Sequence, residues 1–110
     1  MNLEDARRVI AAAENKSKEI GQPMNIAVAD EGGNLLSHIR MDGAWLGSID
    51  ISIKKAYTSR AFDIATKDLA TIFAGGIPLK KNGKVVGAIG VSGGSGDQDH
   101  AVAEAGAAAF

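Results

Sequence analysis

The chain has no cysteine and few aromatic residues or prolines: 5% of its 110 residues are Phe, Trp or Tyr, and two are Pro. The lack of cysteine excludes disulfides, thiol nucleophiles and thiolate metal sites. Because aromatic residues are few, Ala, Val, Ile and Leu must form most of the core. No apolar run approaches the roughly 20 residues that a membrane-spanning helix needs.

An excess of charge of either sign is also lacking, since 12 Lys and Arg oppose 13 Asp and Glu for a net charge of −1. The basic residues are dispersed, so we expect no nucleic-acid partner. The N-terminus has no signal-peptide pattern, and we expect a cytoplasmic protein that does not bind membranes. The length suits one domain, residues 1–110, and domains this small often gain stability by forming homo-oligomers.

Hydrophobic periodicity and turn residues predict the element order α-ββ-α-ββ-α. The pair Asn82-Gly83 between two apolar runs is a strong hairpin signal. Hairpins imply antiparallel pairing, so the predicted fold class is α/β (α+β) with an antiparallel sheet rather than a parallel dinucleotide-binding sheet. Helices are expected at residues 3–20, 50–68 (beginning near Ser48) and 97–110, and strands at residues 24–30, 35–41, 71–78 and 85–91.

The segment 87–96 (GAIGVSGGSG) invites comparison with a phosphate-binding loop. It lacks the Lys-Ser/Thr ending of a Walker motif, and Asp97 and Asp99 would repel a phosphate at the start of the following helix. We expect instead a tight turn that ends in an Asp or Ser helix cap. Gly87 and Gly90 predict close approach by a neighbouring backbone or by a ligand.

His38 and His100 are the only histidines. Each is a candidate metal ligand, and either could ligate a haem iron because one axial ligand suffices. Asp97, Asp99 and His100 could hold a cation, but we favour a solvated, polar helix start. Because the chain has only two histidines, we expect no serine-hydrolase triad, assign no catalytic residue and expect a binding protein. The hydroxyl-bearing residues that are candidate nucleophiles are Ser48, Ser52, Thr58 and Ser92.

Charged residues flank the first predicted hairpin and the second helix. Asp30, Arg40 and Asp42 lie at the ends of the hairpin strands, where they either line a pocket or solvate the end of the sheet. Lys54 and Lys55 could contact an anionic ligand such as a propionate or a phosphate. Lysines on helices are usually solvated, and we expect the same of these two.

Four segments, taken together, resemble the GlcG/HbpS family, which includes the C-terminal domain of PduO-type adenosyltransferases. They are residues 27–33 (AVADEGG), 40–44 (RMDGA), 55–58 (KAYT) and 75–99, with its GGIPL, GAIGVSGG and QD elements. The resemblance covers nearly the whole chain. It implies a profilin-like three-layer α/β/α sandwich with a central five-stranded antiparallel sheet, assembly into homo-oligomers and, in some members, haem binding.

The resemblance also implies a function. We expect a small-molecule-binding domain, with haem or another tetrapyrrole as a candidate ligand, associated with glycolate, glycerol or propanediol metabolism. The alternatives are a non-catalytic accessory or assembly protein for a diol- or glycerol-metabolising enzyme and, as a third, an enzyme acting on a small organic acid or cofactor. The expected ligand-binding residues are Asp30, Arg40, Asp42, Gly43, Lys55, Gly75, Gly76, Gly93 and Gly94.

The chain departs from the family pattern in one place. Members usually carry a further segment, including a strand, between the second helix and the GGIPL hairpin. Here Leu69-Ala70 runs almost directly into Thr71-Ile72. A sheet without that strand has an open edge. We therefore expect that a stretch between Ala70 and Thr71 is missing from the chain.

Overall fold

In a computed structural model that describes residues 1–69 and 73–110, helix α1 (Leu3–Ile20) occupies its predicted range. Asn2 caps it: the Asn2 side chain accepts a hydrogen bond from Asp5 N at 2.8 Å, and the Asp5 carboxylate accepts one from Asn2 N at 3.1 Å. Gly21, with φ of 72°, ends the helix in the left-handed conformation that glycine adopts without strain. Local sequence therefore sets both ends of α1.

The sheet contains four strands in the described part of the chain: β1 (Asn25–Asp30), β2 (Leu35–Arg40), β3 (Gly76–Lys81) and β4 (Lys84–Ser92). Their order is β2-β1-β4-β3, and each neighbouring pair is antiparallel. The predicted order of helices and hairpins is confirmed. The resemblance implied a fifth strand, and the stretch expected to be missing between Ala70 and Thr71 lies outside the described residues.

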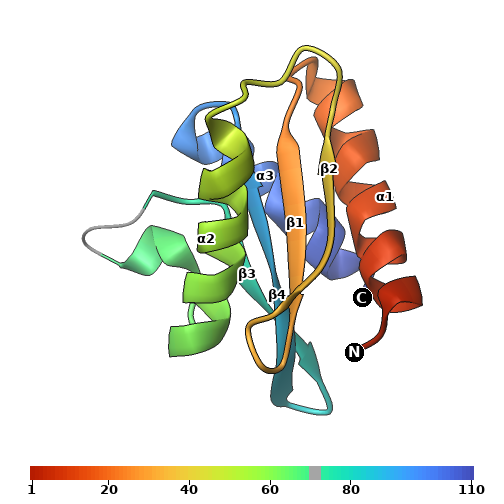
Figure 1. Ribbon diagram of the computed structural model, residues 1–110, viewed down its shortest axis with the longest axis vertical. Coiled ribbons are helices and arrows are strands. Elements are labelled where there is room, and N and C mark those ends of the chain that lie inside the picture. The colour runs from red at the N-terminus through yellow and green to blue at the C-terminus, as the bar shows by residue number, and fades with distance from the viewer. Residues whose placement is uncertain (70–72) are drawn as a thin grey trace.

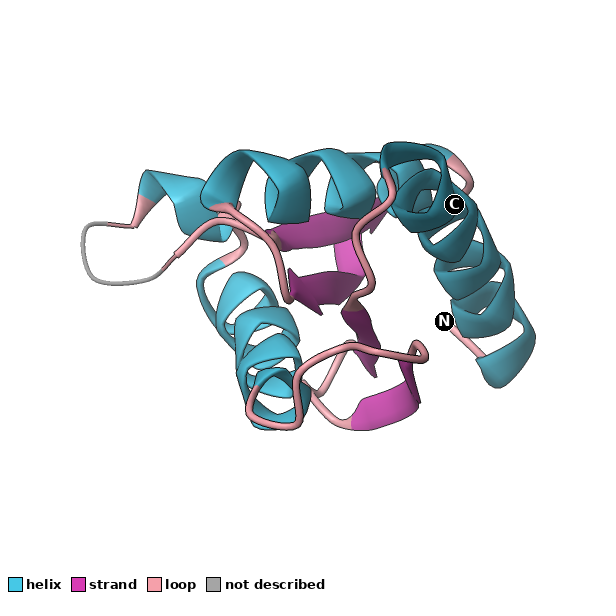
Figure 2. Cartoon of the chain, turned by 90° about the horizontal axis from the view of Figure 1, so that it is seen from above, coloured by secondary structure: helices cyan, strands magenta, loops and turns pink. Residues whose placement is uncertain are grey.

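The sheet lies between two helical layers, as Figures 1 and 2 show. Helices α1 and α3 (Gly96–Ala108) pack together on one face, and α2 (Ser48–Phe62) covers the other. The three-layer α/β/α sandwich is thus confirmed. Within the described ranges, no helix combines the length and apolarity needed to cross a bilayer. The larger core cluster lies under α1 and α3 and includes Val9, Ile10, Ile26, Val28, Leu79, Ile89 and Val102.

Helix α2 lies so close to the sheet that its backbone touches a glycine. A Cβ added to Gly90 would lie 2.1 Å from Ser52 O and 2.4 Å from Ala56 N. The close approach predicted at this position is therefore made by the helix backbone. Such a short separation leaves room only for small side chains and one extended one on the inner face of α2. The buried residues of α2 are Ser48, Ser52, Lys55, Ala56 and Ser59.

The second helix ends earlier than predicted. We expected it to reach residue 68, but Asp63 adopts a left-handed conformation (φ 55°) and α2 ends at Phe62. The Ser59 hydroxyl donates to Ile64 O at 2.8 Å and stabilises this exit. A short 3-10 turn, Thr66–Asp68, follows. The apolar residues at helical spacing, which predicted a longer helix, therefore continue past the point where the helix ends.

The third strand is also shifted from its prediction. It was expected at residues 71–78, of which 71 and 72 lie outside the described residues, with Lys80 and Lys81 in the following turn, but β3 spans Gly76–Lys81. The turn consists only of Asn82 and Gly83, whose φ values are 54° and 78°. Two residues with positive φ suffice to connect twisted antiparallel strands, so both strands extend to the edge of the turn.

The outer edge of β3 offers few hydrogen-bond donors in the described chain. The N–H of Gly76 donates to Thr66 Oγ1 at 2.8 Å, and Pro78 has no N–H. Lys80 and Lys81 add exposed charge at the end of the strand. Prolines, charges and covering segments are the usual means by which edge strands avoid pairing with other chains.

Candidate functional site

A buried ion pair joins the helical layers across the end of the sheet. Lys55 Nζ on α2 lies 3.0 Å from Asp99 Oδ2 on α3, and the two side chains are only 4% and 6% exposed. The ammonium also donates to Val91 O on β4 at 2.8 Å, and Asp99 Oδ1 accepts from Gly94 N at 2.8 Å. Each charge is therefore paired and further hydrogen-bonded, as buried charges require.

Burial of Lys55 corrects the expectation that this lysine is solvated. The inner positions of α2 follow the spacing 48, 52, 55, 59, which places them on one helical face. Gly75, with φ of 121°, makes room for the ammonium, because a Cβ there would lie 3.2 Å from Lys55 Nζ and 2.3 Å from Val91 O. The Gly75 backbone and the inner face of α2 thus enclose the lysine.

The electrostatics of the pair are set mainly by desolvation. Burial raises the pKa of the Asp99 carboxyl above its usual value, while the Lys55 charge and the Gly94 N–H act in the opposite direction. The carboxylate would be costly to bury without these partners. A charged Asp99 at the start of α3 therefore depends on the ion pair with Lys55.

A pocket of about 350 Å³ opens above the ion pair. Its rim is apolar and exposed: Trp45, Ile51 and Phe73 are 69%, 45% and 83% exposed. Its polar lining includes Ser48 and Ser92, each 5% exposed. Hydroxyl-bearing side chains that line a cavity can form hydrogen bonds to a ligand or to water.

The glycine-rich turn forms the wall of this pocket on the side of α3. Gly93, Gly94 and Gly96 line it. The turn ends in a capping box, in which Ser95 Oγ accepts from Gln98 N at 3.2 Å and Gln98 Oε1 accepts from Ser95 N at 2.9 Å. The predicted Ser cap is confirmed, and Asp99 adds a second cap through Gly94.

Of the residues predicted to bind a ligand, the structure brings together Lys55, Gly75, Gly93 and Gly94. Gly76 lies beneath the same helix, where an added Cβ would be 2.7 Å from Lys55 O. These residues come from α2, the start of β3 and the turn after β4. The other four predicted residues lie elsewhere.

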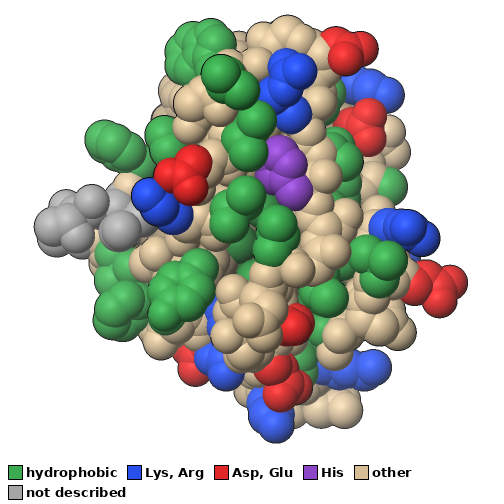
Figure 3. Space-filling view, viewed as in Figure 1, with side chains coloured by type: hydrophobic (Ala, Val, Ile, Leu, Met, Phe, Trp, Pro, Cys, Tyr) green, Lys and Arg blue, Asp and Glu red, His purple; other side chains and the backbone are tan. Residues whose placement is uncertain are grey.

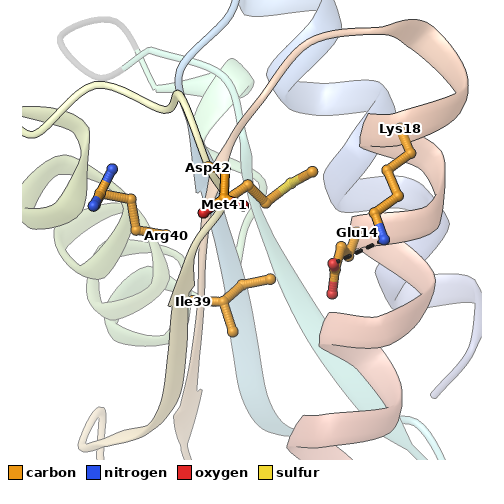
Figure 4. A pocket seen from close by; sticks show the side chains of 6 residues that line it. All are labelled: Glu14, Lys18, Ile39, Arg40, Met41 and Asp42. Carbon is orange, nitrogen blue, oxygen red and sulfur yellow. Dashed lines mark ion pairs between the residues drawn. The ribbon is translucent and has the colours of Figure 1, made fainter.

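Arg40 and Asp42 line a different cleft, of about 450 Å³, between α1 and β2. Figure 4 shows Ile39 and Met41 pointing toward α1, whereas Arg40 points away from it. The Arg40 guanidinium donates to Ala44 O at 3.3 Å. The cleft's other cation is paired as well, since Lys18 Nζ lies 3.2 Å from Glu14 Oε2.

Asp30 and Gly43 have local structural roles. Asp30 Oδ1 accepts hydrogen bonds from Gly32 N and Asn34 N, both at 2.9 Å, and so shapes the turn between β1 and β2. Gly43 has φ of 83° in the connection after β2. The structure does not bring either residue to the pocket over Lys55.

The two histidines do not converge with other metal ligands. Within the described part of the chain, His38 Nε2 and His100 Nδ1 are buried without a hydrogen-bond partner, and burial lowers the pKa of His38. His100 Nε2 lies 3.5 Å from Glu104 Oε1, and Asp99 turns toward Lys55 instead. In residues 1–69 and 73–110, no three His, Asp or Glu side chains are placed to hold a metal ion.

Comparison with known proteins identifies relatives along the whole chain. The family model described as "Haem degrading protein HbpS-like" matches residues 1–108. An uncharacterized 15.0 kDa protein from the dhaT-dhaS intergenic region of Citrobacter freundii is 38% identical over 94% of this chain and 87% of the relative. Protein GlcG of Escherichia coli K12 is 35% identical over 79% of this chain and 77% of its own length.

A solved structure, that of a PduOC:heme complex, superposes with a TM-score of 0.95 at 27% identity, covering 100% of this chain and 94% of that chain. The alignment with the Citrobacter freundii relative spans 124 positions, but 94% of a 110-residue chain fills only about 103 of them.

Sequence reasoning missed the apolar rim and did not group the polar lining. Trp45, Ile51 and Phe73 belong to three separate segments, and no local pattern connects them. Ser48 and Ser92 were considered only as nucleophiles. One signal was present: a helical face made of serines and one lysine, beside glycine-rich strands, indicates a helix packed closely through a polar face.

Proposed function

We propose that this chain, which belongs to the HbpS-like family, is a small-molecule-binding domain whose ligand occupies the pocket over Lys55 and Asp99. The observation that carries the proposal is a cavity of about 350 Å³ that combines an apolar rim with two largely buried serines, Ser48 and Ser92. Ligand sites combine apolar walls with a few convergent polar groups. Lys55 and Asp99 neutralise each other, which favours binding over catalysis.

The test is ligand-observed NMR with a panel of small acids, amides, diols and sugars. Wild-type protein should give saturation-transfer signals with at least one class, and the Ser92→Val variant should bind that compound at least tenfold more weakly. Ser37→Val on β2 is the matched control, since Ser37 lies outside the pockets described above and should leave binding unchanged. Absence of any bound compound, or equal binding by Ser92→Val, would contradict the proposal.

Haem is a second candidate ligand, and the fold shared with the PduOC:heme complex favours it. The pocket over Lys55 does not fit haem iron, because no His, Cys or Met lines it. His38 is the residue that suits the iron best: its Nε2 atom has no hydrogen-bond partner among the described residues, and burial lowers its pKa, which favours the neutral imidazole that binds iron. Bound haem would supply a redox-active iron at β2.

A haem titration followed by visible absorption tests this second candidate. Binding through His38 should shift the Soret band, and His38→Ala should abolish the shift while Ser92→Val retains it. His100→Ala serves as the matched control on the other histidine. A titration without a Soret shift, or one that survives substitution of both histidines, would count against haem.

Two further proposals concern partners. The relative encoded between dhaT and dhaS and the similarity to PduOC support a role beside glycerol- or propanediol-metabolising enzymes, either through the bound ligand or as an accessory protein. Exposed apolar side chains support contacts with other chains, including further copies of this one. They are Trp45, Leu46, Phe62 and Phe73, each at least 65% exposed; Figure 3 shows hydrophobic side chains gathered on the α2 side of one face.

A further inference from the structure

The groups that the pocket offers to a ligand include several hydrogen-bond donors. Both oxygens of Asp99 are engaged, Oδ1 by Gly94 N and Oδ2 by Lys55. The Lys55 ammonium has three N–H groups and two acceptors, Val91 O and Asp99 Oδ2. Its third N–H has no acceptor among the described residues. Ser48 and Ser92 each bring an O–H to the same cavity.

The rim of the pocket favours a ligand that has an apolar portion. Trp45, Ile51 and Phe73 line the opening, and each of these side chains is at least 45% exposed. A volume of about 350 Å³ corresponds to about twelve non-hydrogen atoms when each is given the roughly 30 Å³ that one water occupies in the liquid. The site therefore suits a small molecule with one polar end.

Resting on the proposed function, we infer that the ligand is a small monocarboxylate with a short apolar or aromatic tail. The carboxylate accepts hydrogen bonds from Lys55, Ser48 and Ser92, and the tail packs against the aromatic rim. Carboxylate oxygens are acceptors only, so they can accept from the Lys55 ammonium and from both serine O–H groups. Each hydrogen bond to an ionised acceptor is stronger than one between neutral groups.

Charge restricts the ligand to a single negative charge. Lys55 is already neutralised by Asp99, so the floor of the pocket has no net charge to offset a dianion. The start of the 13-residue helix α3 favours an anion, but only by the equivalent of about half a positive charge. Asp97 in the same first turn opposes more highly charged ligands such as inorganic phosphate.

The test measures affinities of isosteric pairs by NMR titration of the wild-type protein. Benzoate is compared with benzamide and butyrate with butyramide; propane-1,2-diol and inorganic phosphate complete the panel. We expect each carboxylate to bind at least tenfold more tightly than its amide, with amide shifts at Gly94 and Gly96. Ser48→Ala and Ser92→Ala should each reduce this preference at least threefold, and Ser37→Ala should not.

Each of the other possible outcomes contradicts one part of the proposal. If amides or the diol bind as tightly as the carboxylates and Ser92→Ala weakens them, the ligand class is wrong and the binding site stands. If phosphate binds more tightly than benzoate and butyrate, the restriction to one charge is wrong. If no compound shifts Gly94 or Gly96, both the ligand class and the proposed function are overturned.

Discussion

Gly90→Ala is expected to destabilise the protein by more than about 3 kcal/mol, beyond the usual range for an added methyl group. The new Cβ would lie 2.1 Å from Ser52 O and 2.4 Å from Ala56 N, and neither backbone atom can move without lifting α2 from the sheet. Because Lys55 lies on the same helix, its pairing with Asp99 should be lost as well. Urea denaturation followed by circular dichroism measures the effect.

Gly47→Ala is the matched control for that substitution. Gly47 has φ of −62°, and no atom lies within 4 Å of an added Cβ. Alanine there should leave the free energy of unfolding within about 0.5 kcal/mol of wild type. Equal stability of Gly90→Ala and Gly47→Ala would mean that α2 does not rest on the sheet as described.

Lys55→Met is expected to cost about 3–5 kcal/mol, because it leaves the Asp99 carboxylate buried without its counter-charge. Adding Asp99→Asn should recover part of the loss, since the amide oxygen still accepts from Gly94 N and carries no charge. The double variant should therefore be more stable than Lys55→Met alone. A thermodynamic cycle from urea denaturation measures this coupling.

The pH dependence of the same variants gives a second readout. Burial already raises the pKa of Asp99, and removing Lys55 removes an influence that lowers it. The folded state then binds a proton more readily than the unfolded state, so Lys55→Met should gain stability as the pH falls toward the usual carboxyl pKa. The double variant should lack this gain. A single variant whose stability falls over that acidic range would show that Asp99 is not buried as a charge.

Features encoded by neighbouring residues were predicted from the sequence. The ends of α1 follow from Asn2 and Gly21, and the hairpin between β3 and β4 follows from Asn82-Gly83. The end of α2 was not predicted, because Asp63 in a left-handed conformation carries no strong sequence signal. Helical spacing alone does not show where a backbone breaks.

The candidate site was predicted only in part because its residues meet through tertiary packing. The family motifs pointed to Lys55 and to the glycines of both turns, yet the same motifs grouped Arg40 and Asp42 with them. Arg40 is the last residue of β2 and Asp42 follows that strand, at the opposite edge of the sheet from β3. Burial of Lys55 depends on how closely α2 approaches the sheet, and that distance is set by glycines far along the chain.

The protected edge of β3 has a consequence for how the protein behaves in concentrated solution. Fibril growth by strand addition requires a row of unsatisfied backbone donors, and here Thr66 occupies the one at Gly76 while Pro78 lacks its own. A second copy that meets this edge therefore finds few free backbone N–H groups to pair with. The β3 edge is therefore a poor site for strand addition, whereas contacts between side-chain surfaces can close into finite particles.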